Sequence, residues 1–247
     1  MSKKKNDPKI LVFDIETAGV QGLSADRGFV VCFGYKWLGE KTTHCLTIAD
    51  FPGRNIHDDK QLLKRIVEFF EKADGSVAHF GAKFDKPYLQ ARLLQAGLNP
   101  IPDNKLTDTC LLARTHLRIS SNRLGNLASF LRVDTQKMEK RGGWPAWWMG
   151  ALRGDKKSIS LMATYCKQDV QCLAEVFLRM RHIIPTRYLP INMAIGAALW
   201  TCPSCGGHRS ISKGYSWSEK KCWQRRQCMG CGKYVHLAKA IASTPVI

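Results

Sequence analysis

The stretch Lys9-Ile-Leu-Val-Phe-Asp-Ile-Glu-Thr17 decides the fold of this 247-residue chain. Its apolar residues, Ile10–Phe13, form a continuous run that is typical of a strand buried on both faces. Side chains alternate along a strand, so Asp14 and Glu16 at its end are expected to point to the same side. Two carboxylates there repel each other and lose hydration, and a divalent cation between them relieves both costs. The alternative is an ordinary acidic turn after a strand.

The composition describes a globular protein with a strong excess of positive charge. Hydrophobic residues make up 45% of the chain, and 38 Lys and Arg against 20 Asp and Glu leave a net charge of +18. This imbalance favours a polyanionic partner, first of all nucleic acid. No basic amphipathic helix indicates a membrane surface, and no apolar run reaches the ~18 residues of a membrane span. With no signal-peptide pattern either, we expect a cytoplasmic protein without a membrane partner.

The order of apolar segments predicts a mixed α/β sheet with helices on its faces. Three sequential strands with short connections, at 10–15, 29–38 and 42–48, indicate an antiparallel start. Helical spacing then alternates with short strands, the two helices lying at 58–73 and 87–96. The intervening strands are expected at 76–80 and 105–109. This alternation is typical of an α/β domain.

The later part of the chain predicts two more helices and an irregular connection. Ser121 or Asn122 is the expected cap of a helix that ends at Leu131. Residues 132–157 are rich in Gly and Trp and indicate an irregular segment. One long helix is expected over 158–182.

Further acids stand at places where a functional site is often built. Asp85 follows the fourth predicted strand, at the start of a helix, and Asp169 lies in the long late helix. Tyr165 precedes Asp169 by four residues, so the two share one helix face. Taken singly, each has an ordinary explanation, because Asp at a helix start is usually a cap and Tyr with Asp at this spacing are usually surface neighbours.

The order of these motifs resembles the DEDD superfamily of 3′–5′ exonucleases, also called DnaQ-like, which has an RNase H-like fold. The resemblance covers about residues 9–183 and rests on three separated motifs in the family's order. The longer sequence motifs around these residues are similar to those of the YprB-type, RNase H-like branch found in many phage and bacterial proteins. The stretches that carry it are Phe13-Asp-Ile-Glu-Thr17, His79-Phe-Gly-Ala-Lys-Phe-Asp-Lys-Pro-Tyr-Leu89, Thr107-Asp-Thr109 and Tyr165-Cys-Lys-Gln-Asp-Val170.

The resemblance implies a two-metal phosphodiester hydrolase that releases 5′-mononucleotides from the 3′ end of DNA or RNA. It matches the tyrosine subclass, because Thr164 stands where the histidine subclass carries His. Tyr165 is then expected to orient the attacking water. The carboxylates expected to bind two Mg²⁺ or Mn²⁺ ions are Asp14, Glu16, Asp85 and Asp169.

One residue departs from the family pattern. This branch often has Asn where Phe80 stands here, and that Asn is not a metal ligand, so the departure affects substrate contacts. Two other functions stay open: a structure-selective endonuclease on the same RNase H-like fold, and a non-catalytic nucleic-acid-binding module. The sequence does not distinguish DNA from RNA or single strands from duplexes.

Two further features have structural explanations. Asp108, near the end of the fifth predicted strand, is expected to be a cap or hydrogen-bond acceptor. The aromatic cluster Trp144-Pro-Ala-Trp-Trp148 favours a hydrophobic plug beside the sheet over base stacking, which is the alternative.

Four of the ten cysteines form two Cys-x-x-Cys knuckles, and the other six are expected to be mainly small core residues. The knuckles, Cys202-Pro-Ser-Cys205 and Cys228-Met-Gly-Cys231, are typical of one closed, structural four-thiolate Zn²⁺ site. Redox pairs and disulfides are the alternatives that a reduced compartment disfavours. Pro185 and Pro190 mark a boundary, so three parts are expected: a basic tail, an RNase H-like exonuclease domain and a zinc ribbon, over residues 1–8, 9–188 and 198–240.

The segment between the knuckles alternates basic and aromatic side chains, a pattern typical of phosphate contact and base stacking. A ribbon that only docks on the first domain or binds a protein is the alternative. No polymerase domain is evident, so a replication or repair protein is a candidate partner, in the host cytoplasm if the protein is phage-encoded. The side chains expected to bind nucleic acid are Lys213, Trp217, Lys220, Lys221, Trp223, Arg225 and Arg226.

Overall fold

The computed structural model describes residues 8–19, 24–51, 55–136, 144–185, 188, 200–218 and 221–236. The chain divides into two compact units, Met1–Arg179 and Met180–Ile247. Within the described residues, no helix is long and apolar enough to cross a membrane. The predicted basic tail lies outside the described residues, except for Pro8.

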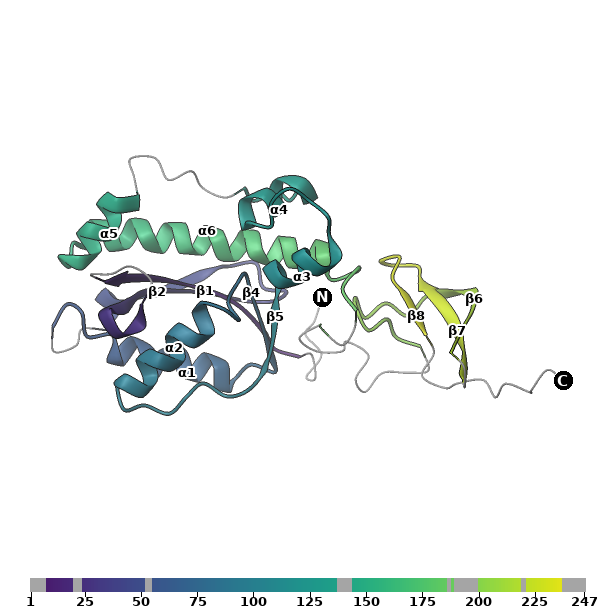
Figure 1. The fold of residues 1–247 in the computed structure, drawn as a ribbon, viewed down its shortest axis with the longest axis horizontal. Helices are drawn as coiled ribbons and strands as arrows, with labels where there is room; N and C mark the ends of the chain where they lie inside the picture. The colour runs from purple at the N-terminus through teal and green to yellow at the C-terminus, as the bar shows by residue number, and fades with distance from the viewer. Residues whose placement is uncertain are drawn as a thin grey trace. The chain divides into compact units, whose positions relative to one another are not determined.

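The first unit is built on a five-stranded mixed sheet of order β3-β2-β1-β4-β5 (Figure 1). The first three strands pair antiparallel, and β1–β4 and β4–β5 pair parallel, so the predicted mixed α/β fold is confirmed. The parallel pairs require crossovers, which α1 and the segment containing α2 supply. The strands are β1 (Ile10–Gly19), β2 (Gly28–Trp37), β3 (His44–Thr47), β4 (Gly75–Ala78) and β5 (Lys105–Asp108).

The central strand β1 is longer than its apolar run predicts. The prediction that Asp14 and Glu16 end this strand is wrong, because pairing with β2 resumes at Thr17 and continues to Gly19. The register shifts between Glu16 and Thr17, which marks an irregularity in the ladder directly after the second acid. Such irregularities bend a strand and change the direction of its side chains. The two acids therefore lie next to a bend in β1.

Helices cover both faces of the sheet (Figure 1). Helix α1 (Lys60–Glu71) buries an apolar stripe that includes Leu62, Ile66 and Phe70, and the Phe70 ring packs edge-on against Phe13 at 4.9 Å between centroids. The same side of the sheet carries α2 (Asp85–Gln95). The remaining helices are α3 (Thr109–His116), α4 (Leu124–Leu131), α5 (Trp144–Leu152) and α6 (Lys156–Met180), and two short 3₁₀ turns, η1 (Ala25–Arg27) and η2 (Ile48–Asp50), complete the unit.

Two predictions for the later part of this unit are wrong. Helix α4 starts at Leu124 with Arg123 at its cap position, and Ser121 accepts a hydrogen bond from the Arg123 N–H instead of capping the helix. The predicted irregular connection 132–157 contains α5, because Trp147, Trp148, Ala151 and Leu152 pack against the core from one helix. The packing of Trp147 and Trp148 on the core agrees with the expected hydrophobic plug.

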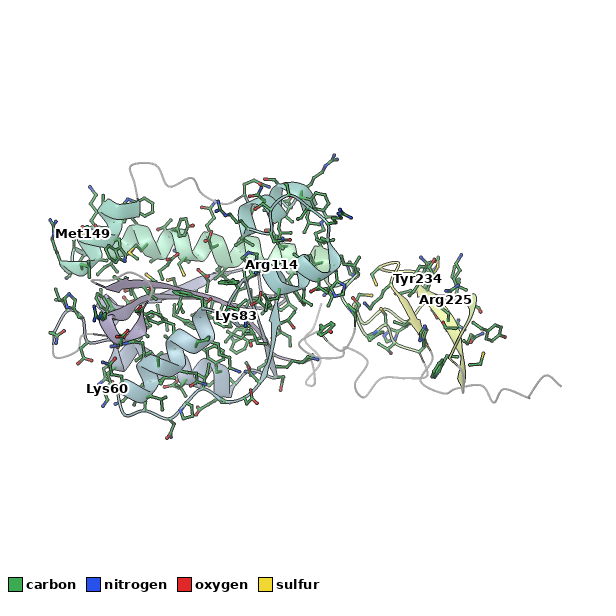
Figure 2. The ribbon with its side chains drawn as sticks, viewed as in Figure 1. Lys60, Lys83, Arg114, Met149, Arg225 and Tyr234 are labelled. Atoms are coloured by element: carbon green, nitrogen blue, oxygen red, sulfur yellow. The ribbon has the colours of Figure 1, made fainter. Side chains whose placement is uncertain are left out.

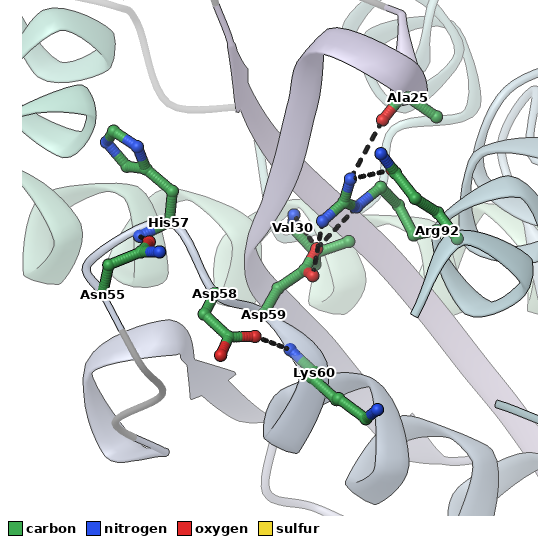
Figure 3. Close-up of polar contacts among 9 residues, drawn as sticks. Ala25, Val30, Asn55, His57, Asp58, Asp59, Lys60 and Arg92 are labelled. Atoms are coloured by element: carbon green, nitrogen blue, oxygen red, sulfur yellow. Dashed lines mark hydrogen bonds and ion pairs between the residues drawn. The ribbon is translucent and has the colours of Figure 1, made fainter. Parts of the chain in front are cut away.

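An ion pair between Asp59 and Arg92 connects several elements around this sheet (Figure 3). Asp59, 1% exposed, accepts two hydrogen bonds from the Arg92 guanidinium, at 2.8 and 3.0 Å, and one from the Val30 N–H at 2.8 Å. Arg92 also donates to the Ala25 carbonyl. The pair therefore joins the start of α1, the last turn of α2, β2 and η1 through bonds that satisfy both charges.

The second unit contains a three-stranded antiparallel sheet of order β6-β7-β8. Its strands are β6 (Ser210–Ser218), β7 (Lys221–Cys228) and β8 (Tyr234–His236). Within this unit the ammonium group of Lys233, 7% exposed, donates to the carbonyls of His182 and Ile184, and Ser204 donates to the Arg181 carbonyl. The residues just after α6 are thereby bound to the segment that carries the knuckles.

Candidate active site and four-cysteine cluster

Three carboxylates from distant parts of the chain lie together in the first unit. Asp14 and Glu16 come from β1 and Asp169 from α6, and one oxygen atom of each lies within 4.8 Å of the others. Asp169 is 5% exposed, and Asp14 is partly buried. Carboxylates held this close repel one another, and a divalent cation with hard oxygen ligands offsets that repulsion. The chemistry of these donors therefore fits Mg²⁺ or Mn²⁺.

A glycine in the sheet brings α6 close enough for Asp169 to reach the strand acids. Gly34 is the β2 partner of Asp14, and a Cβ atom on Gly34 would lie 2.6 Å from the Cys166 sulfur and 2.9 Å from a Val170 methyl group. Any larger side chain would push the helix away. Cys166 also lies 3.7 Å from a carboxylate oxygen of Asp14, so the helix packs directly against the first acid.

Tyr165 lies one turn before Asp169 and is only 1% exposed. The ring of Trp147, from α5, packs edge-on against it at 6.5 Å between centroids. The contact packs the ring of Tyr165, on α6, against α5. The Trp-rich helix thus supports the tyrosine, a role that the sequence does not reveal.

Asp85 contacts β1 at Ile15, between Asp14 and Glu16, but is not part of the group of three acids. It is the first residue of α2, 3% exposed, and its Oδ1 accepts a hydrogen bond of 3.0 Å from the Ile15 N–H. That N–H lies beyond the last β1–β4 register pair, Val12 with Val77, so the carboxylate satisfies a strand donor. Burial raises the pKa of Asp85 to about 7, against the hydrogen bonds that favour its charged form.

Asp108 organises the turn between β4 and α2. Its Oδ1 accepts from the backbone N–H groups of Cys110 and Leu111, which caps α3, and also from the Phe80 N–H at 3.0 Å. Its Oδ2 accepts from the Ala82 N–H at 3.0 Å. The expected structural role of Asp108 is confirmed, and it extends from the helix cap to the neighbouring turn.

A cavity of about 740 Å³ opens beside the carboxylates. Asp14 and Asp169 lie in its wall together with residues of the β4–α2 turn, of α3 and of the α3–α4 connection. Figure 2 shows Arg114 projecting from α3 in this part of the unit. The volume is in the range of ligand sites, and the wall combines two acids with basic, amide, hydroxyl and aromatic side chains. The acids thus have adjacent space for a polar ligand.

The four knuckle cysteines of the second unit form one cluster. Their sulfur atoms all lie within 4.8 Å of one another, with 3.7 Å between Cys202 and Cys231 and 3.6 Å between Cys205 and Cys228. Both knuckles close with the same turn, which needs a positive φ of 73° at Gly206 in the first and an equal angle at the matching glycine in the second. The two halves therefore present their thiols in equivalent ways.

Backbone amides also approach the sulfurs. The Gly207 N–H donates to Cys205 and the Gly230 N–H donates to Cys228, each at 3.4 Å. Burial raises the pKa of the Cys205 thiol to about 12, whereas N–H donors hold the pKa of Cys228 below its usual value despite burial. Four sulfur ligands at this spacing fit a tetrahedral Zn²⁺ ion, which would hold all four as thiolates.

The residues expected to bind nucleic acid differ in their exposure and in the contacts they make within the protein. Lys213 and Arg225 are exposed, and the Arg225 guanidinium lies 5.8 Å from the centre of the Tyr234 ring (Figure 2). Arg225 also donates from Nε to the Lys213 carbonyl, and Arg226 donates to the Ser210 hydroxyl and carbonyl and is less exposed. The ring of Trp223 stacks on His236 at 6.1 Å. Lys220 and the side chains of Trp217 and Lys221 lie outside the described residues.

Comparison with known proteins assigns the family. The RNase H superfamily matches residues 11–181 of the chain, which is most of its length. The chain belongs to the RNase H superfamily. It is 30% identical over 141 residues to a DNA polymerase III PolC-type protein of Ureaplasma parvum serovar 3, a stretch that covers 50% of this chain and 10% of that protein.

The fold of this RNase H superfamily member is also similar to a solved polymerase. The family B DNA polymerase from Pyrobaculum calidifontis aligns with a TM-score of 0.53 at 14% identity, over 87% of this chain and 32% of that one. At this identity the likeness concerns the fold alone. The chain thus corresponds to a small part of each of these proteins.

The structure unites some of the predicted site residues of this RNase H superfamily chain and separates others. Asp14, Glu16 and Asp169 come together, Asp85 accepts from the Ile15 N–H, and Tyr165 lies one turn from Asp169. Sequence reasoning missed part of the cavity wall. One sequence feature pointed to this wall: Phe80 stands where the family branch often has Asn. The missed wall residues include His79, Arg114, Asn122, Arg123 and Asn126.

Proposed function

We propose that this protein is a metal-dependent 3′–5′ exonuclease of the tyrosine DEDD subclass. The observation that carries the proposal is the group of three carboxylates, Asp14, Glu16 and Asp169, two of which, Asp14 and Asp169, line a cavity within an RNase H superfamily domain. Hydrolysis of a phosphodiester requires an activated water and stabilisation of a charged leaving oxygen. Two Mg²⁺ or Mn²⁺ ions would supply both functions.

Each residue has a distinct proposed role. Asp14, Glu16 and Asp169 would hold the cations next to the substrate phosphate. Asp85 is the fourth ligand through its second oxygen, because Oδ1 is bound to the Ile15 N–H. The Tyr165 hydroxyl orients the attacking water, and the contact with Trp147 keeps its ring in place. The sugar and base of the substrate bind in the cavity next to these acids.

DNA is the first substrate to test. The relative that shares 30% identity is named as a DNA polymerase III, and the net charge of +18 suits any polyanion. We propose further that the four-cysteine cluster binds one structural Zn²⁺ ion and that the ribbon around it contacts the nucleic-acid strand. Its exposed Lys213 and Arg225 support this role. A replication or repair protein is the corresponding candidate partner.

Replacement of Asp169 by Asn tests the proposed site. We expect hydrolysis of a 3′-labelled single strand in Mg²⁺ or Mn²⁺ to fall by about 100- to 1,000-fold, because one charged ligand contributes several kcal/mol to the transition state. Thermal unfolding should not move to lower temperature, because removal of one charge relieves repulsion within the triad. The matched control is Asp26→Asn, a surface acid with 77% of its side chain exposed, which should retain full activity.

A closed circular single strand separates the exonuclease from the endonuclease alternative. The wild-type protein should release mononucleotides from a linear strand and leave the circle intact. Nicking of the circle at a comparable rate would favour the endonuclease. Equal hydrolysis by Asp169→Asn and the parent protein would mean that the assigned carboxylates are not the catalytic site.

A further inference from the structure

Phe80 has a backbone conformation that phenylalanine rarely adopts. Its φ angle is +66°, in the left-handed region that costs a non-glycine residue about 1–2 kcal/mol. The surrounding turn holds this conformation from both sides. The Phe80 N–H donates to Asp108, and its carbonyl accepts from the N–H groups of Lys83 and Phe84 at 3.1 and 3.0 Å. A strained residue fixed so firmly, at the edge of a cavity, is a candidate for a direct function.

The strained turn presents an aromatic ring in the cavity beside the carboxylates. Phe80 is 38% exposed and lines the same cavity as Asp14 and Asp169. The Arg114 guanidinium, on α3, lies 5.4 Å from the centre of the Phe80 ring. An aromatic ring and a guanidinium plane are the two groups that most often stack on nucleobases, and the arginine adds attraction for phosphate.

Asn122 supplies an unused acceptor in the same wall. Its side-chain Oδ1 is buried and has no hydrogen-bond partner among the described residues. A buried acceptor without a partner costs about 1–3 kcal/mol, so a ligand donor that reaches it gains a corresponding advantage. Asn122 lines the cavity together with Phe80 and Arg114. These groups offer a flat apolar face, a cation and a hydrogen-bond acceptor.

We propose that Phe80, Arg114 and Asn122 form a subsite for one nucleobase of the substrate, next to the scissile phosphate. The proposal rests on the proposed nuclease function and specifies which part of the substrate the cavity binds. The base stacks on Phe80, and one of its N–H groups donates to Asn122.

The ordinary explanation of Phe80 is that its ring packs as part of the core. Asn adopts the left-handed conformation more readily than Phe, so a Phe80→Asn change removes the ring while relieving the strain. A ring with only a packing role should leave a less stable protein when removed. A ring that serves the substrate should leave a protein that is at least as stable but binds less well.

Substrates that lack one base provide the decisive experiment. A set of 3′-labelled single strands carries one abasic nucleotide at each of the last four positions in turn. Affinity is measured on the Asp169→Asn protein in Mg²⁺, and kcat/KM on the active protein, each with Phe80 and with Phe80→Asn. At one position the missing base should weaken binding and kcat/KM about tenfold with Phe80 present, since stacking on an aromatic contributes about 1–3 kcal/mol per base. With Phe80→Asn that penalty should disappear.

Two controls separate the subsite from general damage. Phe130→Ala removes another exposed phenylalanine, 56% exposed on α4 and outside the cavity wall, and should leave the abasic penalty unchanged. Asn122→Ala should reduce the penalty at the same nucleotide position as Phe80→Asn does.

The possible results are distinguishable. Equal abasic penalties with and without the Phe80 ring, at every position, would overturn the subsite. A position-specific binding penalty that depends on Phe80, in a protein that hydrolyses no substrate, would support the subsite and reject the proposed nuclease function. A lower melting temperature for Phe80→Asn with no position-specific effect would assign Phe80 to packing.

Discussion

The carboxylate group of the first unit and the cysteine cluster of the second both have donor atoms that suit a cation, but they are assembled in opposite ways. The acids come from residues 14 and 169 of the chain and meet because α6 packs on a five-stranded sheet. The cysteines lie within 30 residues, from Cys202 to Cys231, and each pair closes its own turn. The first site depends on a large apolar core, whereas the second is formed largely by local turns.

The cores of the two units explain this difference. The first unit buries aromatic and aliphatic side chains from β1, β2 and α1 in one cluster. The described part of the second unit buries few apolar side chains, and half of them are cysteines: Met180, Ile184, Cys202 and Cys228. A unit with so little core needs a further source of stability, such as a structural metal. The acidic site can therefore exist before its cations bind, while the cysteine unit is expected to require its ion.

Loss of one thiol should produce the largest effect. We expect Cys205→Ser to abolish zinc binding and unfold the second unit, because a structural zinc ion contributes about 10–16 kcal/mol to small zinc domains. The first unit should keep its thermal unfolding transition. Zinc content by metal analysis and protection of the second unit from proteolysis measure the outcome. Cys222→Ser is the matched control, since this cysteine lies on β7 outside the cluster.

Removal of the buried Arg92 guanidinium tests the internal stability of the first unit. We expect Arg92→Ala to lower the free energy of unfolding by about 3–5 kcal/mol, because Asp59 is then left buried without its cation. Chemical denaturation of the first unit measures this loss. Arg65→Ala is the control, because its pair with Glu68 is on the surface and should contribute about 1 kcal/mol or less. An equal loss in both variants would contradict the role assigned to the buried pair.

The raised pKa of Asp85 predicts that the first unit becomes less stable as pH rises in the absence of added Mg²⁺ or Mn²⁺. The folded-state pKa of about 7 exceeds the ordinary value of 3.8, so the folded state binds more protons between these limits. Stability should therefore fall from about pH 4 to pH 7, by at most about 4 kcal/mol.

Asp85→Asn serves as the comparison for this pH effect, because Asn keeps the acceptor for the Ile15 N–H and removes the ionisation. Its unfolding free energy should depend less on pH over the same interval, as measured by denaturation at several pH values. Added Mg²⁺ should also flatten the curve of the parent protein. A parent protein that becomes more stable through this interval would contradict the role assigned to Asp85.

A surface charge of the second unit should give the smallest effect. We expect Arg225→Gln to weaken binding of a single strand by about tenfold and to lower the slope of log K against log salt by about 1. Fluorescence anisotropy at several salt concentrations measures both quantities. Lys72→Gln, which removes a surface charge paired with Glu68 in the first unit, should change neither. An unchanged affinity for Arg225→Gln would favour a ribbon that binds a protein.

Local patterns predicted most elements of the first unit, because apolar periodicity is a property of neighbouring residues. The long helix expected over 158–182 is found as α6, Lys156–Met180. The predictions failed where distant packing decides the outcome. Trp147 and Trp148 lie in a helix because the core offers them burial, and Ser121 does not cap α4 because the connection adopts another turn. Phe80 drew attention as a departure from a motif, but its left-handed backbone was not foreseeable from composition.

The sequence by itself determined the donor types: carboxylates on the first strand and on a late helix, and two closely spaced pairs of thiols. Tertiary structure alone decided which carboxylates meet. Gly34 lets α6 approach the sheet, so Asp169 joins Asp14 and Glu16, whereas Asp85 is turned toward the Ile15 N–H. The physical reason is the sequence separation of the contacts. A knuckle closes through hydrogen bonds between residues that are near in sequence, but a site shared by a strand and a distant helix depends on how the whole core packs.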